Sequence, residues 1–481
     1  MLKKRRKIIT IILSIIYSTF IIIGNSFMLT NSFKWIEKHL FINFVLYIVL
    51  MFIIYIILNK IFTLLDNKKT NIIKFDKIKK LKLYDLFNRY TFLFSLIFMI
   101  ICWLPYIISF YPAILSPDPS FQIRQYFGIP NKYSDYSVMI DPSVTITNHH
   151  PVVHTLLLGT CVKIGTILNN VNIGLFIYSL IQIIVLSSTL AYTIKFLKDN
   201  NIRSNYLILM LLVYSFIPVF PFYSMSAVKD VIFGSLIIHY IITLYKLVKK
   251  DDIKFQNIIK VICLLILIIL FRNNGIHTIA LSFPLLLLIR KKWKYKLKIL
   301  AIFIFIIGFN FSYNSIILPY FRITPTSVRE KLSLPFQQTA RYVKEHNQDI
   351  TEEEKEIIDK VLEYETLAER YKPEIADPVK NKYNKYATNE DLKKYFNVWF
   401  RELKKHPKTY FEATINNTYG YYYPLKTNWY IYCNFDKRIT ENGFNYHYNN
   451  LKLSRIILSG FALVFPYIPI LNIFVNIGFN V

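Results

Sequence analysis

Long apolar runs separated by short polar segments make up most of the chain. A helix that crosses a bilayer needs about 20 predominantly apolar residues, and the runs predict about ten such helices. We expect these helices at residues 8–29, 40–58, 91–110, 172–196, 206–222, 228–248, 258–270, 276–289, 297–318 and 454–479. The pattern therefore predicts an all-α polytopic membrane protein.

One further apolar run, residues 151–168, decides the topology. If this run crossed the membrane, the basic clusters at 195–203, 246–254 and 290–296 would lie on the side opposite to the lysine-rich N-terminus. Lysine and arginine concentrate in cytoplasmic loops, so that arrangement is disfavoured. We therefore expect residues 151–168 to lie along the outer surface as an interfacial helix, with the N-terminus in the cytoplasm.

This topology divides the chain into three parts. Residues 1–316 would form the transmembrane bundle, which includes an outer loop at 111–171. Residues 317–453 would form an extracytoplasmic helical domain, in which Thr351 and Glu354 form a capping box that predicts a helix start. Residues 454–481 would form a C-terminal transmembrane helix. The expected location is the cell membrane, with the large polar domain outside.

Composition agrees with a membrane location. Charged residues make up 18% of the chain, whereas soluble proteins contain about a quarter. The net charge of +28 would suggest nucleic-acid binding in a soluble protein. Here the lysines lie between apolar runs, so we expect membrane lipids and no nucleic acid as partners. Four cysteines predict no disulfide framework, and the chain has no nucleotide-binding loop, zinc-protease motif or serine-hydrolase motif.

Asp118 stands between two prolines in the outer loop, which fix it on a stiff turn. Near the bilayer its pKa can be raised, so it can act as a general base, or it can ligate a divalent cation. A plain turn aspartate is the alternative. His149 and His150 follow, with His154 one turn later, and we favour contact with a phosphate over zinc because no Glu or Cys stands nearby.

Further candidates are polar residues expected at the outer ends of membrane helices. Ionisable groups at membrane depth often mark a substrate path, which points to Lys229, Arg272 and Asn273. The alternatives are snorkelling or pairing with Asp230 for Lys229, and a tight turn at Arg272. In the outer domain, the candidates Gln338 and Arg341 suit sugar or phosphate contacts, although an ordinary role as polar helix residues is favoured.

The order of these motifs resembles the GT-C class of membrane glycosyltransferases, which includes protein O-mannosyltransferases and aminoarabinose transferases of lipid A. The segments that carry the resemblance are Ser116–Ser120 and Asn148–Pro151. The chain also looks like a polytopic family of unknown function from Gram-positive bacteria, on motifs at Asp118, Asn148–Pro151, Lys229–Asp230, Arg272–Gly275 and Gln337–Arg341.

The GT-C resemblance implies transfer of a sugar, with inversion, from a polyprenyl-phosphate donor to an acceptor in the cell envelope. Asp118 would be the general base, and His149, His150, Lys229 and Arg272 would hold the leaving phosphate. Pro119 occupies the place where the class often has a second acid, which argues against a two-carboxylate or metal-dependent mechanism. The alternatives are a transporter or flippase of an envelope lipid or polysaccharide, and a non-enzymatic assembly protein.

Overall fold

The computed structural model describes residues 2–66, 82–131, 144–249, 254–288, 291–426, 431–432, 446–468 and 471. Every regular element in these residues is a helix, which confirms the all-α prediction. The chain forms two compact units, of which the first contains Met1–Ile72, Ser327–Tyr430 and Phe465–Val481, and the second contains Ile73–Thr326 and Ile431–Val464. This grouping differs from the expected boundaries at 316 and 453, because the N-terminal helices group with the polar domain.

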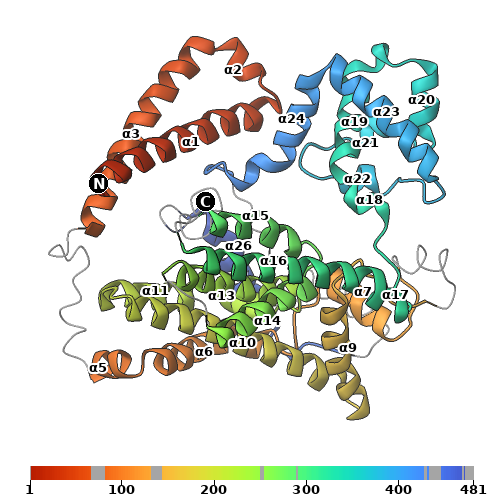
Figure 1. The fold of residues 1–481 in the computed structure, drawn as a ribbon. Coiled ribbons are helices and arrows are strands. Elements are labelled where there is room, and N and C mark those ends of the chain that lie inside the picture. The colour runs from red at the N-terminus through yellow and green to blue at the C-terminus, as the bar shows by residue number, and fades with distance from the viewer. Residues whose placement is uncertain are drawn as a thin grey trace. The chain divides into compact units, whose positions relative to one another are not determined.

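The second unit contains most of the apolar helices together with shorter, more polar ones (Figure 1). They are α5 (Lys82–Arg89), α6 (Thr91–Ser109), α7 (Pro117–Tyr126), α9 (Val152–Ile167), α10 (Val171–Asp199), α11 (Ser204–Phe216), α12 (Val219–Met225), α13 (Lys229–Lys249), α14 (Phe255–Phe271), α15 (Gly275–Leu287), α16 (Trp293–Ser312), the π-helix η1 (Tyr313–Ile317), α17 (Leu318–Tyr320) and α26 (Lys452–Val464). Leu265, Ile279 and Ile299 lie in the buried core that joins α14, α15 and α16. Many other apolar side chains face outward, as a lipid-exposed surface requires.

Within the described residues, six helices are long and apolar enough to cross a membrane, or seven if α11 and α12 count as one span. These two helices are bent by 49° at their break. Helices α14 and α15 have 17 and 13 residues and are therefore shorter than the 18 residues taken as the minimum for a span. The multi-pass character is therefore confirmed, whereas the expected total of about ten spans is not. Much of the expected helix at 454–479 lies outside the described residues beyond α26.

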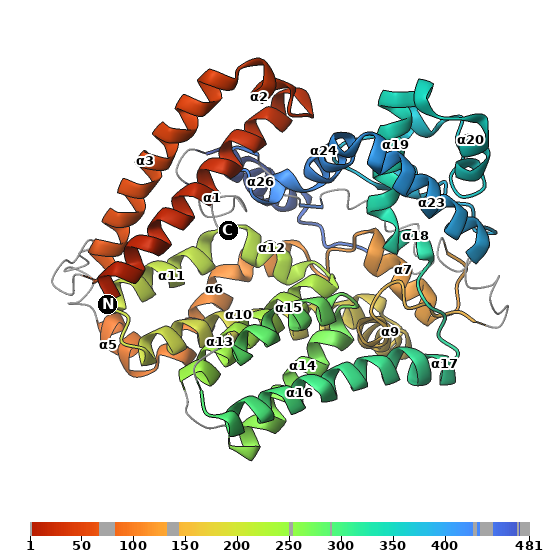
Figure 2. The ribbon, with the colours of Figure 1, turned by 45° about the horizontal axis from the view of Figure 1, so that its top comes forward.

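Helix α9 covers the run whose topology was in question. It has 16 residues and, as Figures 1 and 2 show, it runs crosswise to α6 and α10 instead of alongside them. Its packing on α10 requires two glycines, because a Cβ on Gly165 would come within 2.8 Å of the Gly174 backbone. That this helix lies along the membrane surface stays a prediction.

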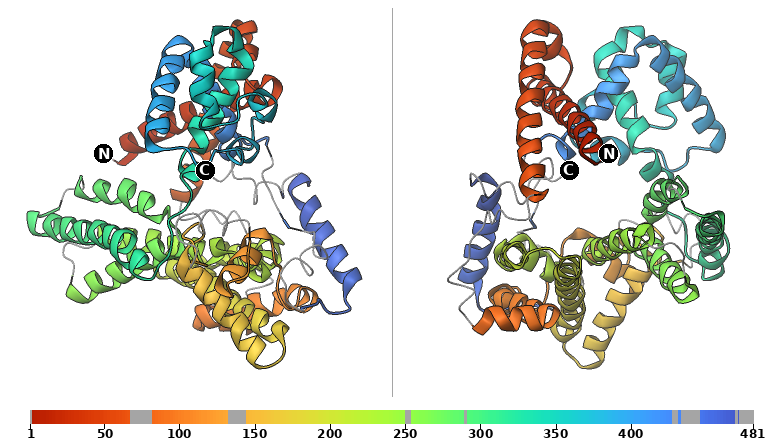
Figure 3. Two further views of the ribbon diagram at one scale, coloured as in Figure 1. Left: turned by 90° about the vertical axis from the view of Figure 1, so that its right-hand side faces the viewer. Right: turned by 60° about the vertical axis from the view of Figure 1, so that its left-hand side comes forward.

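The first unit combines a helical hairpin with a polar domain (Figure 3). Its helices are α1 (Leu2–Thr30), α2 (Lys34–Lys38), α3 (Leu40–Asp66), α18 (Val328–Lys331), α19 (Ser333–His346), the 3-10 helix η2 (Asn347–Asp349), α20 (Glu352–Asp359), α21 (Leu367–Arg370), α22 (Asp377–Lys380), α23 (Asn389–Lys405), α24 (Pro407–Thr418), and the 3-10 helices η3 (Tyr419–Tyr421) and η4 (Phe465–Tyr467). Phe336, Ile358 and Tyr395 lie at the centre of the polar domain. The expected capping box at Thr351 and Glu354 is present.

The polar domain is attached to the turn that follows α1. Glu412 accepts a hydrogen bond from the backbone N–H of Phe33 at 2.8 Å, and Asn416 donates to the Asn31 carbonyl at 2.7 Å. Gly24 allows α1 to approach the ring of Tyr423, which a Cβ would meet at 2.3 Å. The domain therefore lies at the end of α1 opposite to the basic N-terminus.

Candidate functional site

Two short backbone pairings bring the polar motifs of the second unit together. The Ile114 N–H donates to the Met225 carbonyl at 2.8 Å, and the Ala227 N–H donates back to Ile114 at 3.0 Å. This pairing holds the proline-rich loop beside the turn that starts α13. A second pairing joins Asn148 to Thr324 at 2.8 Å, and so places the histidine motif beside the segment after α17.

Asp118, Lys229 and His150 meet where these segments converge. The Lys229 ammonium donates to Asp118 Oδ2 at 3.1 Å, and His150 Nδ1 lies 3.9 Å from the same oxygen. The Asp118 side chain is 47% exposed, whereas those of Lys229 and His150 are 16% and 3% exposed. Asp118 stands in the first turn of α7, where the helix dipole favours a negative charge. The carboxylate is thus the accessible member of an otherwise buried cluster.

The charges in this cluster differ from those expected. Burial acts to raise the pKa of Asp118, but the neighbouring His150 and the charge and hydrogen bond of Lys229 outweigh it, and the pKa lies below its ordinary value. Burial holds the pKa of His150 well below its ordinary range, so His150 is neutral. The positive charge next to the Asp118 carboxylate is therefore that of Lys229. The expected raised pKa of Asp118 is therefore wrong. At neutral pH the cluster holds one carboxylate, one ammonium and an uncharged imidazole.

Helix α9 supports this cluster through a buried network of side chains. Gln122 Nε2 donates to the Thr155 hydroxyl at 2.9 Å, so its Oε1 accepts from His154 Nδ1 at 3.0 Å. His154 Nε2 then accepts from the Tyr178 hydroxyl at 2.6 Å. Burial lowers the pKa of His154 to about 3. His154 therefore fixes α7 and α10 to α9 as a neutral ring.

Arg272 and Asn273 lie beside the same cluster through different contacts. Arg272 forms an ion pair with Asp230, the neighbour of Lys229, and its guanidinium lies 5.2 Å from the centre of the Phe233 ring. Asn273 donates to the Asn148 carbonyl at 2.7 Å. Gly275 lets α15 begin close to α14, since a Cβ would come within 2.5 Å of an α14 carbonyl oxygen. Lys229 and Arg272 are therefore each paired with a carboxylate, Asp118 and Asp230 respectively.

His149 contacts Thr147, Thr326 and His150. Its backbone N–H donates to the Thr147 hydroxyl at 3.2 Å, and its Nδ1 lies 3.3 Å from the Thr326 hydroxyl. Its ring meets the His150 ring edge to face, with centres 4.6 Å apart. His149 can therefore position His150, while a direct contact with substrate stays a prediction.

Gln338 and Arg341 lie in the first unit, on α19. Gln338 donates to the Thr414 hydroxyl at 3.0 Å. Arg341 is 2% exposed, pairs with Glu412 at 2.5 Å and donates to the Asn31 carbonyl at 2.9 Å. Through these contacts Gln338 links α19 to α24, and Arg341 links α19 to α24 and to the turn after α1. The alternative favoured from sequence, a structural role, describes them better than substrate binding.

Sequence patterns did not single out Gln122 or Tyr178 as members of the cluster. The sequence indicated Asp230 only as a possible partner of Lys229, and in the structure it pairs with Arg272 instead. Gln122 stands one helical turn after Asp118, which places both on one face of α7. Tyr178 carries no signal of its own, since one tyrosine among 36 in the chain is not distinctive.

Comparisons with other proteins give a family and no activity. No curated protein and no solved structure matches the chain significantly. One family profile, described as a family of unknown function (DUF6020), matches residues 2–481, and the chain therefore belongs to that family.

Proposed function

We propose that the protein is a membrane glycosyltransferase that uses a polyprenyl-phosphate-linked sugar and modifies an acceptor of the cell envelope. The observation that carries this proposal is the convergence of Asp118, Lys229 and His150 from three separate segments at one end of the helix bundle. An accessible carboxylate beside a buried cation matches the two needs of this reaction, a proton acceptor and a partner for the leaving phosphate.

In the proposed reaction, an acceptor hydroxyl oxygen attacks the anomeric carbon and forms the new glycosidic bond. The bond from that carbon to the phosphate oxygen breaks, and its electron pair leaves with the phosphate. The hydroxyl proton passes to Asp118, whose carboxylate is ionised at neutral pH. Neutral His150 can orient either group by a hydrogen bond without adding charge. The identity of the sugar is left open.

The pairing of Lys229 with Asp118 suggests that the donor binds before Asp118 acts as a base. In the structure the ammonium is 3.1 Å from the carboxylate, which weakens that carboxylate as a base. A donor phosphate would offer Lys229 a second anionic partner. Loss of the Lys229 contact and the added negative charge would both raise the pKa of Asp118. Donor binding would therefore prepare the base.

The distribution of charge supports an outer location for this cluster. Lys229 begins α13 and Lys249 ends it, and this helix of 21 residues is about 30 Å long at 1.5 Å per residue. This length matches the hydrocarbon thickness of a bilayer. Lys198 and Lys246 also lie towards the far ends of α10 and α13. If the basic ends are cytoplasmic, the Asp118 cluster faces outward.

A lipid carrier is the second candidate, favoured by the break between α11 and α12. Interrupted membrane helices often border the substrate site of transporters. The 49° bend at this break is separated by the short helix α12 from the turn that pairs with Ile114. A carrier would need the cations for headgroup recognition and would have no need for a base.

The proposal is tested by comparing lipid-linked sugars and cell-wall glycans from a deletion strain and an Asp118→Asn strain. A transferase predicts that both strains lose the same glycan and accumulate the same lipid-linked precursor. An Asp118→Asn strain with the full amount of a glycan that the deletion strain lacks would refute the transferase and favour the carrier.

A further inference from the structure

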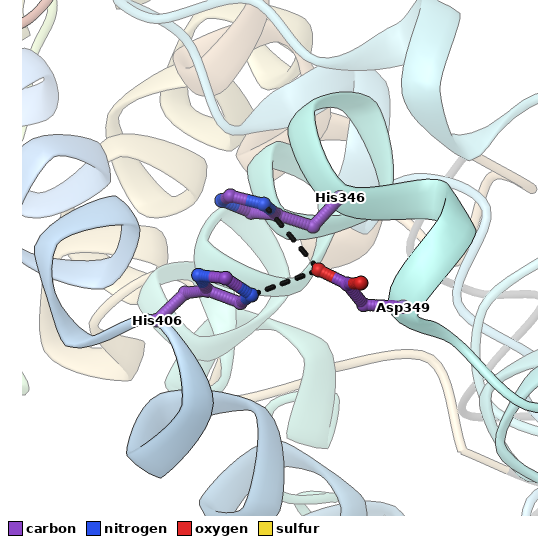
Figure 4. A group of neighbouring side chains, drawn as sticks. All are labelled: His346, Asp349 and His406. Atoms are coloured by element: carbon purple, nitrogen blue, oxygen red, sulfur yellow. Dashed lines mark hydrogen bonds and ion pairs between the residues drawn. The ribbon is translucent and has the colours of Figure 1, made fainter.

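Three side chains that could bind a metal ion gather in the polar domain of the first unit, and the glycosyltransferase proposal uses none of them. His346 ends α19, Asp349 ends η2, and His406 joins α23 to α24 (Figure 4). Their ligand atoms all lie within 4.8 Å of one another. Residues 57 to 60 positions apart in the chain are thus brought to one point on the domain surface.

The hydrogen bonds around His346 direct one lone pair into the cluster. The Thr409 hydroxyl lies 3.3 Å from Glu345 Oε2, which can only accept, so Thr409 donates to that carboxylate. Thr409 Oγ1 then accepts from His346 Nε2, 2.8 Å away. A neutral imidazole carries one N–H, so His346 Nδ1 presents a lone pair. Thr409 is 4% exposed, which fixes this arrangement.

This lone pair faces a second electron-rich atom. His346 Nδ1 lies 3.8 Å from Asp349 Oδ2, and His406 Nε2 lies 2.9 Å from the same oxygen. The two imidazole rings are stacked, with centres 3.8 Å apart and planes 10° from parallel. A nitrogen lone pair and a carboxylate oxygen repel each other unless a positive charge stands between them. A cation held between these atoms would remove the repulsion.

We propose that His346, Asp349 and His406 form a Zn²⁺ site. Two imidazole nitrogens favour zinc over magnesium or calcium, which prefer oxygen ligands. Three protein ligands leave one position of a tetrahedral ion for water. The Glu345–Thr409–His346 chain supplies the outer hydrogen bond that orients a zinc-bound histidine.

Binding requires a small movement of the rings. Zinc lies close to the plane of each imidazole at about 2.0 to 2.1 Å from the nitrogen, so parallel rings must splay apart. The side chains have room for this, because His346, His406 and Asp349 are 24%, 35% and 49% exposed. The ion would then join the end of α19 and η2 to the junction of α23 and α24, and so stabilise the polar domain.

The test uses the full chain in detergent, with any affinity tag removed and with bound metal stripped by a chelator. Zinc binding is measured by equilibrium dialysis for the wild type, His406→Ala, Asp349→Asn and the control His39→Ala. His39 lies in the same unit and packs on Trp35. We expect His406→Ala and Asp349→Asn to weaken binding at one site by more than about 10-fold, since even outer partners contribute 10- to 100-fold.

Two further measurements separate lost ligation from misfolding. Without zinc, all variants should unfold at similar temperatures, and added zinc should raise the unfolding temperature of the wild type and His39→Ala only. Thr409→Val should weaken zinc binding by about 10- to 100-fold while it keeps all three ligands. Equal zinc binding by the wild type and His406→Ala, or no zinc binding by the wild type, would overturn the proposal.

Discussion

Asp118 is held by contacts from several segments that are distant in the chain. Lys229, 111 residues away, supplies its ion pair, and the Ile114 to Met225 pairing fixes the two loops. The side chain nevertheless stays half exposed, as a base that must meet an acceptor requires. The proposed role of Asp118 as a base depends on its being ionised and paired with Lys229.

The pH dependence of stability tests that charge. A carboxyl whose folded pKa is lowered stabilises the fold above its unfolded pKa of about 3.9, and this contribution is lost as pH falls through the folded pKa. The wild type should therefore exceed Asp118→Asn in stability near neutral pH, by about 1 kcal/mol or less because the group is half exposed. Unfolding temperatures measured from about pH 7 to about pH 3 should converge at the acid end. A difference that grows towards acid pH would contradict the assigned pair.

Arg341 gives a second test at the scale of residues. It is buried against Glu412, and removal of one partner of a buried ion pair costs about 3–5 kcal/mol. Arg341→Ala should therefore lower the unfolding temperature strongly. Lys355→Ala, which removes the exposed pair with Glu352, should change stability by less than about 1 kcal/mol. A stable Arg341→Ala protein that has lost donor binding would restore Arg341 as a substrate contact.

At the scale of elements, the apolar runs predicted the helices well because a membrane span must be long and continuous. The span expected at 206–222 is instead broken into α11 and α12, because Pro218 holds Ile217 in an extended conformation. Pairings between helices could not be predicted in this way. Apolar periodicity does not reveal that Gln122 meets His154, or that Arg341 meets a carbonyl 310 residues away.

The contact between α7 and α9 can be tested at one glycine. A Cβ on Gly159 would come within 2.1 Å of the Tyr126 ring, so Gly159→Ala should push α7, and Asp118 with it, away from α9. We expect a loss of about 1–3 kcal/mol in stability, together with reduced activity. Gly234→Ala on α13 is the matched control, because nothing lies within 4 Å of its added Cβ, and it should be neutral or stabilising. Equal stability of the two variants would contradict the close packing.

At the scale of the whole molecule, the account rests on an outer face that carries the Asp118 cluster. Each unit supports this face separately: the polar domain is attached to the end of α1 opposite to the basic N-terminus, and the cluster lies at the end of α13 opposite to Lys249. From the positive-inside rule we expect both polar regions to lie outside, which stays a prediction. This expectation comes from the sequence alone, because it depends on where the lysines lie and not on side-chain contacts.

Cysteine labelling tests the orientation of α10. In a protein with its native cysteines replaced, Leu168→Cys and Ile202→Cys place one exposed thiol at each end of this helix. In intact cells an impermeant maleimide should label position 168 directly and position 202 only after permeabilisation. The reverse pattern would mean either that α9 crosses the membrane or that the cluster faces the cytoplasm.

The most direct measurement of the central claim follows turnover and donor binding on the same reconstituted protein. Polyprenyl-phosphate glycolipids extracted from cells that contain the protein serve as donor, and the wild type is compared with Asp118→Asn and Lys229→Gln. The account predicts that Asp118→Asn retains the donor lipid but forms product more slowly by about 10²-fold or more. Lys229→Gln should bind the donor more weakly. Product formation by Asp118→Asn at the wild-type rate would contradict the assignment of Asp118 as the catalytic base.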